Sequence, residues 1–143
     1  MSLFSALSIS ASGMSAQRTR AEVITENLAN AETTRTPDGG PYRRKDVVFE
    51  SGGGSPSFSS VFGDAMAPGG VSVSAINVDQ GDPERRYQPG HPDAGADGYV
   101  AYPRINPAEE MVDLMSASRG YQANIASMSA LKDMISHSID LLR

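Results

Sequence analysis

The residues of this sequence that could take part in catalysis are few and stand apart from one another. His91 lies in a Pro/Gly-rich turn and His137 in a helical C-terminal stretch, and neither belongs to a catalytic motif. Ser129 and Lys132 have the S-x-x-K spacing of acyl-serine enzymes, but the companion motifs of those enzymes are missing. We therefore predict structural roles for these four side chains and no enzymatic activity.

The sequence offers equally little for metal or cofactor chemistry. Asp93 and Asp97, within the run DAGADG, resemble the start of a calcium loop, but the middle acidic ligand and the closing Glu are missing. The glycines at 52–54 are not followed by the Lys-Ser/Thr pair of a phosphate-binding loop. The chain has no Cys, which excludes disulfides and thiolate sites. We expect no cofactor and no bound metal.

The charge balance argues against nucleic acid and against anionic membranes as partners. The chain has 12 Lys and Arg against 17 Asp and Glu, a net charge of −5, whereas phosphate binding requires clustered positive charge. The N-terminal stretch lacks a basic leading segment, and serines interrupt its apolar residues. We therefore predict neither a cleaved signal peptide nor a transmembrane span, and no direct membrane insertion.

One local basic cluster stands out against this acidic background. Arg43, Arg44 and Lys45 follow one another in a stretch that reads as a strand. Exposed charge runs are ordinary on a solvated strand face. The alternative is that the cluster docks onto an acidic partner, and the sequence leaves both interpretations open.

A long helix is predicted over residues 1–31. Apolar and small residues recur there at alternating steps of four and three, the spacing of a coiled-coil seam. The seam positions are Leu3, Leu7, Ser10, Met14, Gln17, Ala21, Ile24, Leu28 and Ala31. No charge occurs before Arg18, and the other faces carry mostly Ser and Ala, although a water-exposed helix normally has a charged face. We predict that other protein surrounds this helix on several sides.

A second long helix is predicted over residues 106–143. Asn106 can cap it, Pro107 suits its first position, and Glu109 stands where a capping box places its acidic residue. The seam spacing returns at Met111, Leu114, Ser118, Tyr121, Ile125, Met128, Lys132, Ile135, Ile139 and Leu142. The simplest arrangement pairs the two terminal helices with each other.

The residues between the helices, 32–105, are rich in Gly and Pro and predict a small β region. Strands are expected over residues 42–49, 71–78, 84–87 and 99–102, with a bulge or bend near Ala75 and a hairpin joining the last two. Residues 37–41 are a turn cluster, and residues 50–70 are a loop. The predicted fold class is α+β: long N- and C-terminal helices paired as a coiled coil, with a small β-rich middle region.

The apolar content of the seam suggests that the helix pair needs neighbours. Only five N-terminal seam positions are strongly apolar, each contributing roughly 1.5–3 kcal/mol when buried, while ordering costs about 1–2 kcal/mol per residue. An ordinary two-helix core would show the same stripe. The uncharged outer faces favour assembly with other subunits instead.

Two long stretches resemble a known family. Residues 9–50 are similar to the N-terminal region of flagellar proximal rod proteins of the FlgC type, including Asn27-Leu-Ala-Asn30, the N-[LI]-A-N motif of flagellar axial proteins. The stretch Gly39-Gly-Pro-Tyr-Arg-Arg-Lys45 resembles FlgC in particular. Residues 106–125, with Tyr121-Gln-Ala-Asn124, resemble the C-terminal helix of that family. Residues 51–70 match no family pattern.

The resemblance implies a structural subunit of the proximal rod, the axle that transmits motor torque to hook and filament. Such proteins leave the cell interior through the flagellar export apparatus without a cleaved signal, and assemble in the basal body. Their partners are copies of themselves, other rod proteins, the rod-to-membrane-ring adaptor and ring proteins. Another axial protein of the rod or hook is the nearest alternative, and a secreted binding module with a helical stem is a more distant one.

The seam spacing and the resemblance together give the expected assembly interface. On the first helix it comprises Leu3, Leu7, Met14, Ile24, Asn27, Leu28 and Asn30. On the second it comprises Met111, Leu114, Tyr121, Asn124, Ile125, Met128, Ile135, Ile139 and Leu142.

Overall fold

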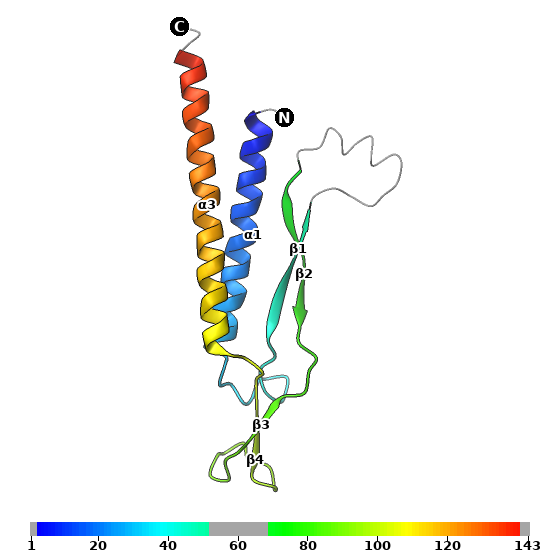
Figure 1. Ribbon diagram of the computed structural model, residues 1–143. Coiled ribbons are helices and arrows are strands. Elements are labelled where there is room, and N and C mark those ends of the chain that lie inside the picture. The colour runs from blue at the N-terminus through cyan, green and yellow to red at the C-terminus, as the bar shows by residue number, and fades with distance from the viewer. Residues whose placement is uncertain (1–2, 52–68, 141–143) are drawn as a thin grey trace, which may run out of the picture.

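Two long antiparallel helices and two small hairpins make up the structure, a computed structural model that describes residues 3–51 and 69–140 (Figure 1). The elements are α1 (Leu3–Ala29), β1 (Lys45–Ser51), β2 (Val71–Val78), β3 (Glu84–Tyr87), β4 (Tyr99–Tyr102) and α3 (Pro107–Asp140). The predicted α+β class, with long terminal helices and a small antiparallel β region between them, is confirmed. The predicted loop at 50–70 lies almost wholly outside the described residues.

Asn30 ends helix α1. Its side-chain Nδ2 donates to the carbonyl oxygen of Glu26 at 2.9 Å, and its backbone N–H donates to the same oxygen at 3.1 Å. The carbonyl oxygen of Asn30 then accepts from the Thr33 N–H at 3.0 Å, which turns the chain away from the helix axis. Asn30 thus satisfies backbone groups that a helix end leaves free, and the end predicted near this residue is confirmed.

Helix α3 begins as its sequence indicates. The Asn106 side-chain oxygen accepts from the Ala108 N–H at 3.1 Å, which is the hydrogen bond of an N-cap residue. Pro107 occupies the first helical position, and Glu109 and Glu110 lie in the first turn. The carboxylates there complement the positive end of the helix dipole.

The two helices pack side by side in a fixed register. Asn27 of α1 contacts Glu110 of α3, and a Cβ added to Gly120 would lie 3.1 Å from the Gln17 side chain. A Cβ added to Gly13 would lie 3.0 Å from the Asn124 side chain. The contacts pair position 27 with 110, 17 with 120 and 13 with 124, so the antiparallel register stays constant along the helices. A larger residue at either close approach would require the facing amide side chain to shift by a few tenths of an ångström.

The face of α3 that contacts α1 differs from the predicted seam. At every second seam position, the residue that faces α1 is the one just before the predicted residue. The structure turns Glu110, Ala117 and Asn124 towards α1, where the prediction placed Met111, Ser118 and Ile125. Met111 and Ile125 are 57% and 47% exposed. The large apolar side chains were taken to mark the paired face, but small residues allow closer approach. The predicted members Leu114, Met128 and Ile135 are half-buried, in agreement with the prediction.

The upper end of α3 extends beyond α1 (Figure 1). When the register is continued upwards, Leu3 at the start of α1 lies opposite Met134. Ile139 lies beyond that point and is 60% exposed. The predicted seam placed Ile139 against α1, but α1 does not reach it. Leu142 lies outside the described residues.

The β1–β2 hairpin lies along the opposite side of α1 from α3 (Figure 1). Its antiparallel register pairs Val48 with Ala75 and Phe49 with Val73, so Ser74 is the extra residue of a bulge. This confirms the bulge predicted near Ala75. The first strand was predicted at 42–49 but spans Lys45–Ser51, because Tyr42 and Arg44 contact the helices instead.

The β3–β4 hairpin has the strand positions that the sequence predicts, with Tyr87 paired to Tyr99. Their rings meet edge-on, with centroids 5.3 Å apart. Gly98 closes the turned tip with φ of 76°, and its carbonyl oxygen accepts from the Gln88 N–H at 2.9 Å. A Cβ at this position would come within 2.8 Å of the Tyr87 ring.

Gly98→Ala is therefore expected to loosen this hairpin by about 1–2 kcal/mol, because alanine is strained at positive φ and collides with Tyr87. The measurement is amide hydrogen exchange at Gln88, which should become faster. Gly90→Ala is the matched control, since a Cβ there would meet nothing within 4 Å. Equal Gln88 exchange rates in the two variants would contradict the prediction.

Candidate functional site

A buried cluster of polar side chains joins the lower ends of α1 and α3 to the start of β1. We call it the polar latch, and it comprises Asn27, Tyr42, Arg44, Lys45 and Glu110. Asn27 is 0% exposed and Glu110 is 1% exposed. Buried polar groups are costly unless they are hydrogen-bonded, so the partners of these two side chains decide whether the latch stabilises the fold.

Asn27 uses all of its hydrogen-bonding capacity. Its Nδ2 donates to the Lys45 carbonyl oxygen at 2.8 Å and to Glu110 Oε2 at 3.1 Å. Its Oδ1 accepts from the Lys45 N–H at 3.0 Å and from the Tyr42 hydroxyl at 3.1 Å. One side chain of α1 thus holds both the incoming strand and the facing helix.

Glu110 brings a negative charge from α3 into this cluster, where Arg44 neutralises it. Arg44 Nε donates to Glu110 Oε1 at 2.6 Å, and this hydrogen bond raises the pKa of the Arg44 guanidinium. Asp113 extends the network, with oxygens 3.8 Å from Arg44 Nη2 and 3.7 Å from Arg20 Nη2. Both oxygens of the buried carboxylate therefore have donors, one from α1 and one from the segment before β1.

Tyr42 closes the latch and is itself shielded from water. Its burial, together with the nearby carboxylates of Glu26 and Glu110, raises the pKa of Tyr42 to about 12. A pKa raised from 10 means that the folded state holds this proton more tightly than the unfolded state. The contribution of Tyr42 to stability is therefore complete below pH 10 and is lost as the pH rises from 10 to about 12.

This gives a spectroscopic prediction. A titration followed by tyrosinate absorbance should show a tyrosine that ionises near pH 12 in the native protein. The signal should vanish in Tyr42→Phe, while Asn27 Oδ1 keeps its hydrogen bond from the Lys45 N–H. Persistence of that step in Tyr42→Phe would show that another tyrosine is responsible.

The basic cluster predicted as a docking site meets acidic partners within the chain at two of its three positions. Arg44 binds Glu110, and the Lys45 ammonium group pairs with Glu26 of α1. Neither residue is a free charge on a solvated strand face. Arg43 is exposed and donates to the Asp79 carbonyl oxygen at 3.2 Å and to Gln80 Oε1 at 3.3 Å. Docking to an acidic partner stays a prediction for all three residues, with Arg43 the most exposed of them.

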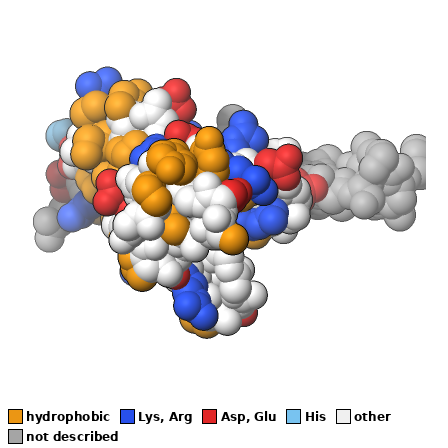
Figure 2. Space-filling view, turned by 90° about the horizontal axis from the view of Figure 1, so that it is seen from below, with side chains coloured by type: hydrophobic (Ala, Val, Ile, Leu, Met, Phe, Trp, Pro, Cys, Tyr) orange, Lys and Arg blue, Asp and Glu red, His pale blue; other side chains and the backbone are white. Residues whose placement is uncertain are grey.

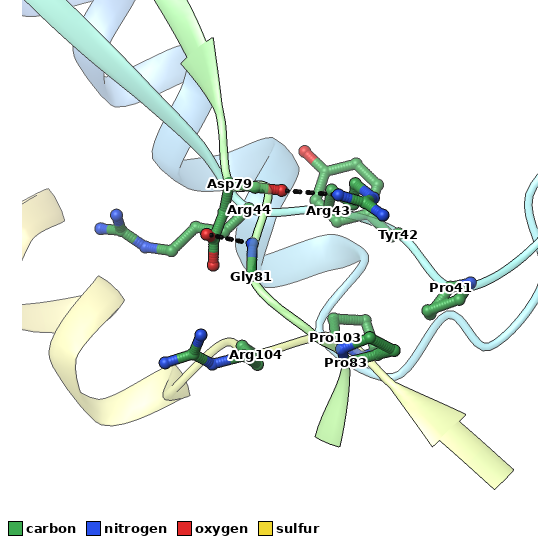
Figure 3. A pocket seen from close by; sticks show the side chains of 9 residues that line it. All are labelled: Pro41, Tyr42, Arg43, Arg44, Asp79, Gly81, Pro83, Pro103 and Arg104. Atoms are coloured by element: carbon green, nitrogen blue, oxygen red, sulfur yellow. Dashed lines mark hydrogen bonds between the residues drawn. The ribbon is translucent and has the colours of Figure 1, made fainter. Parts of the chain in front are cut away.

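A small hollow lies beside the latch, between the start of β1 and the segments that flank β2 and β4 (Figure 3). In this view Arg43 reaches towards Asp79, whose side-chain oxygen accepts from the Gly81 N–H at 2.9 Å, while Arg44 and Arg104 point the other way. Prolines 41, 83 and 103 form its lower wall. The hollow therefore has basic side chains around its rim that diverge instead of meeting on one point.

The predicted interface residues fall into two groups. Ile24 and Asn27 are buried within the chain, and Leu7, Met14, Leu28, Asn30, Leu114, Asn124, Met128 and Ile135 are half-buried. Met111, Tyr121, Ile125 and Ile139 are exposed. The sequence analysis did not identify Glu110, Tyr42 or the glycines of the seam as functional residues. The one signal in the sequence was that Glu110 has the same helical spacing as Ala117 and Asn124, the residues of α3 that face α1.

The residues considered for catalysis have ordinary surroundings. His91 Nδ1 accepts from the Asp93 N–H at 3.1 Å, and Asp93 accepts from the Thr34 hydroxyl at 2.8 Å. Ser129, Lys132 and His137 are exposed on α3. Within residues 3–51 and 69–140, no group of three or more His, Cys, Asp or Glu is placed to hold a metal ion. Over the same residues, no helix is long and apolar enough to cross a membrane.

Two family models match the stretches of the chain that contain the two helices. Residues 7–35 match the family model described as flagella basal body rod protein. Residues 96–141 match the model described as flagellar basal body rod FlgEFG protein C-terminal. The two matches cover α1 and its end, and β4 with α3. They define the class as flagellar basal-body rod proteins.

Whole-chain relatives narrow this class. The flagellar basal-body rod protein FlgC of Bacillus subtilis is 43% identical, over 99% of each chain. That of Borreliella burgdorferi is 40% identical over 100% of this chain and 99% of its own, and that of Salmonella typhimurium is 39% identical over 99% and 98%. The chain belongs to the FlgC family of flagellar basal-body rod proteins.

Proposed function

We propose that this chain, a structural subunit of the flagellar rod, assembles through two uncharged segments of its helix pair, residues 3–17 of α1 and 120–131 of α3. The single observation that carries this proposal is the distribution of charge. Residues 3–17 of α1 and 120–131 of α3 contain no charged side chain, and the register places these segments side by side. The uncharged segment of α1 alone is about 22 Å long at ~1.5 Å per residue.

Exposed apolar side chains on this segment support the same proposal. Phe4 is 78% exposed, and Ile125 and Tyr121 are 47% and 38% exposed. A helix that stays in water normally has charges on its outer face, and these helices have them only outside this segment. Burial against neighbouring subunits accounts for both the missing charge and the exposed apolar groups.

The proposed interface keeps the residues expected from the sequence, with different tasks for the two groups. Tyr121 and Ile125, exposed within the uncharged segment of α3, and Met111 and Ile139, exposed outside it, are proposed to contact neighbouring subunits directly. The buried and half-buried members, such as Ile24, Asn27 and Leu114, shape the helix pair that presents them. The terminal helices, 1–31 and 106–143, would form the rod core, and residues 32–105 would form its outer part.

Family membership supports the remaining details of the proposed function. We propose a place in the proximal rod, as part of the axle that transmits motor torque to hook and filament. The partners would be further copies of the chain, other rod proteins, the rod-to-membrane-ring adaptor and the ring, with Arg43 available for an acidic partner. The chain would be exported through the flagellar export apparatus without a cleaved signal. Its structural role would involve no catalysis and no cofactor.

Hydrogen exchange tests this proposal. In the purified chain, amides of residues 3–17 and 120–140 should exchange faster than those near the latch, because neighbours that cover the upper helices are missing. In isolated basal bodies the same amides should be protected. Strong protection of the helix ends in a monodisperse monomer would contradict the proposal and favour a self-contained binding module.

A further inference from the structure

We infer that the contact between Asn27 and Glu110 selects one of two axial registers that the seam between α1 and α3 would otherwise accept. This inference concerns the chain by itself and does not depend on the proposed assembly. It follows from three features of the seam: the size of its side chains, an unsatisfied oxygen, and the position of its only buried interhelical hydrogen bond among the described residues.

The first feature is that small residues recur in the seam above the latch. Gly13 of α1 lies against Asn124, Gly120 of α3 lies against Gln17, and Ala117 of α3 is buried. Large side chains interlock in only one arrangement, whereas Ala, Ser and Gly fit one another at several spacings. Packing in this segment therefore discriminates weakly between registers.

The second feature is an internal cost of the observed register. Gln17 Oε1 is buried and has no hydrogen-bond partner among the described residues. A buried acceptor without a donor loses the free energy of its hydration. Gln17 lies against Gly120, which has no side chain to supply a donor.

A shift of α3 by four residues, about one helical turn or ~6 Å, would relieve that cost. Asn124 would then lie opposite Gln17, where its amide can donate to Oε1. Gly120 would lie opposite Ala21, and Ala117 opposite Ile24. The pairs Gly120–Ala21 and Ala117–Ile24 each include a small residue, while Asn124 would replace Gly120 against Gln17.

The polar latch is what disfavours this shift. Leu114 would move opposite Asn27, and Glu110 would lose the Asn27 amide that now donates to it at 3.1 Å. Arg20 and Asp113, now 3.7 Å apart, would separate as well. Buried polar contacts are known to fix the register of paired helices in this way. Asn27 and Glu110 are therefore positioning residues that determine which parts of α3 face α1.

The experiment uses disulfide formation in the full chain, which has no native cysteine. Gln17→Cys/Gly120→Cys reports the observed register, and Ala21→Cys/Gly120→Cys reports the shifted one. Each pair is combined with Asn27→Leu/Glu110→Leu, which replaces both buried polar groups by apolar ones of similar size. Such a double replacement is expected to preserve helix content, which circular dichroism measures.

With the latch intact, only the pair at 17 and 120 should form a disulfide efficiently under mild oxidation, since disulfide geometry tolerates little displacement. In the latch-free background the yield of the disulfide between positions 21 and 120 should rise on the order of tenfold, which is the effect of losing one buried hydrogen bond. Arg18→Leu/Glu22→Leu, which removes an exposed ion pair within α1, is the control and should give no gain.

Exclusive crosslinking at 17 and 120 in a helical, latch-free chain would overturn the inference. If the double leucine variant loses its helical signal, Glu110→Leu alone replaces it, because leucine removes the acceptor of the Asn27 amide while Asn27 keeps its hydrogen bonds to Lys45. A gain of the shifted disulfide in Glu110→Leu supports the inference, and its absence there overturns it.

Discussion

Ile125→Asp is expected to abolish incorporation of this subunit into the rod while leaving the folded chain intact. Ile125 is 47% exposed and lies one position away from Asn124, the residue that contacts α1. The new carboxylate therefore stays in water in the free chain. In the assembled rod the same carboxylate would be enclosed by uncharged neighbours, at a cost of several kcal/mol if it stays ionised.

The measurement is swimming motility in a strain that lacks its own copy of this protein, together with the amount of subunit in isolated basal bodies. Ser116→Asp is the matched control, because Ser116 is exposed on the same helix but lies one turn from Arg119 in a charged segment. It should assemble normally. Normal motility with Ile125→Asp would show that this face of α3 is not part of the interface.

Arg44→Met is expected to reduce the free energy of unfolding by about 3–5 kcal/mol, the usual effect of leaving one partner of a buried ion pair alone. Glu110 is 1% exposed, and Arg44 supplies its shortest hydrogen bond at 2.6 Å. Without the guanidinium, Glu110 keeps only the Asn27 amide. A folded protein typically has a free energy of unfolding of only about 5–15 kcal/mol, so the variant should unfold at a markedly lower urea concentration than the parent chain.

Urea unfolding followed by circular dichroism measures this loss. Arg18→Met removes the exposed pair with Glu22 and should cost less than about 1 kcal/mol. The double variant Arg44→Met/Glu110→Leu should recover much of the loss, since it removes the stranded charge too. A loss in Arg44→Met no larger than in Arg18→Met would mean that the latch contributes little.

The secondary structure of this chain could be predicted because its signals are local. Asn106 and Pro107 mark a helix start by their own chemistry, and Asn30 marks a helix end. The alternation in residues 71–78 and its break near Ala75 predict both a strand and its bulge, and the structure has both. The structure also gives two residues of the family motifs a physical role. Asn27 of the first motif is the centre of the latch, and Asn124 of the second packs against Gly13.

The pairing face of α3 and the latch could not be predicted in the same way. Met111 and Ile125 form a regular apolar stripe, and spacing alone does not tell whether a stripe faces this chain or another one. The contact of Glu110 with Asn27 joins residues 83 apart, and that with Arg44 joins residues 66 apart. Before the fold is known, Glu110 reads as an ordinary acidic residue in the first turn of a helix.

The view along the molecule from its lower end shows basic and acidic side chains interspersed with apolar ones (Figure 2). The mixture contrasts with the uncharged segments 3–17 of α1 and 120–131 of α3.

The wide sequence separation between the two halves of the latch also affects the order in which the molecule can form. Translation proceeds from the amino terminus, so Asn27, Tyr42 and Arg44 leave the ribosome long before Glu110 exists. Until then the pocket for that carboxylate is vacant and α1 has no antiparallel partner. The nascent polypeptide should consequently lack the paired helices for most of its synthesis.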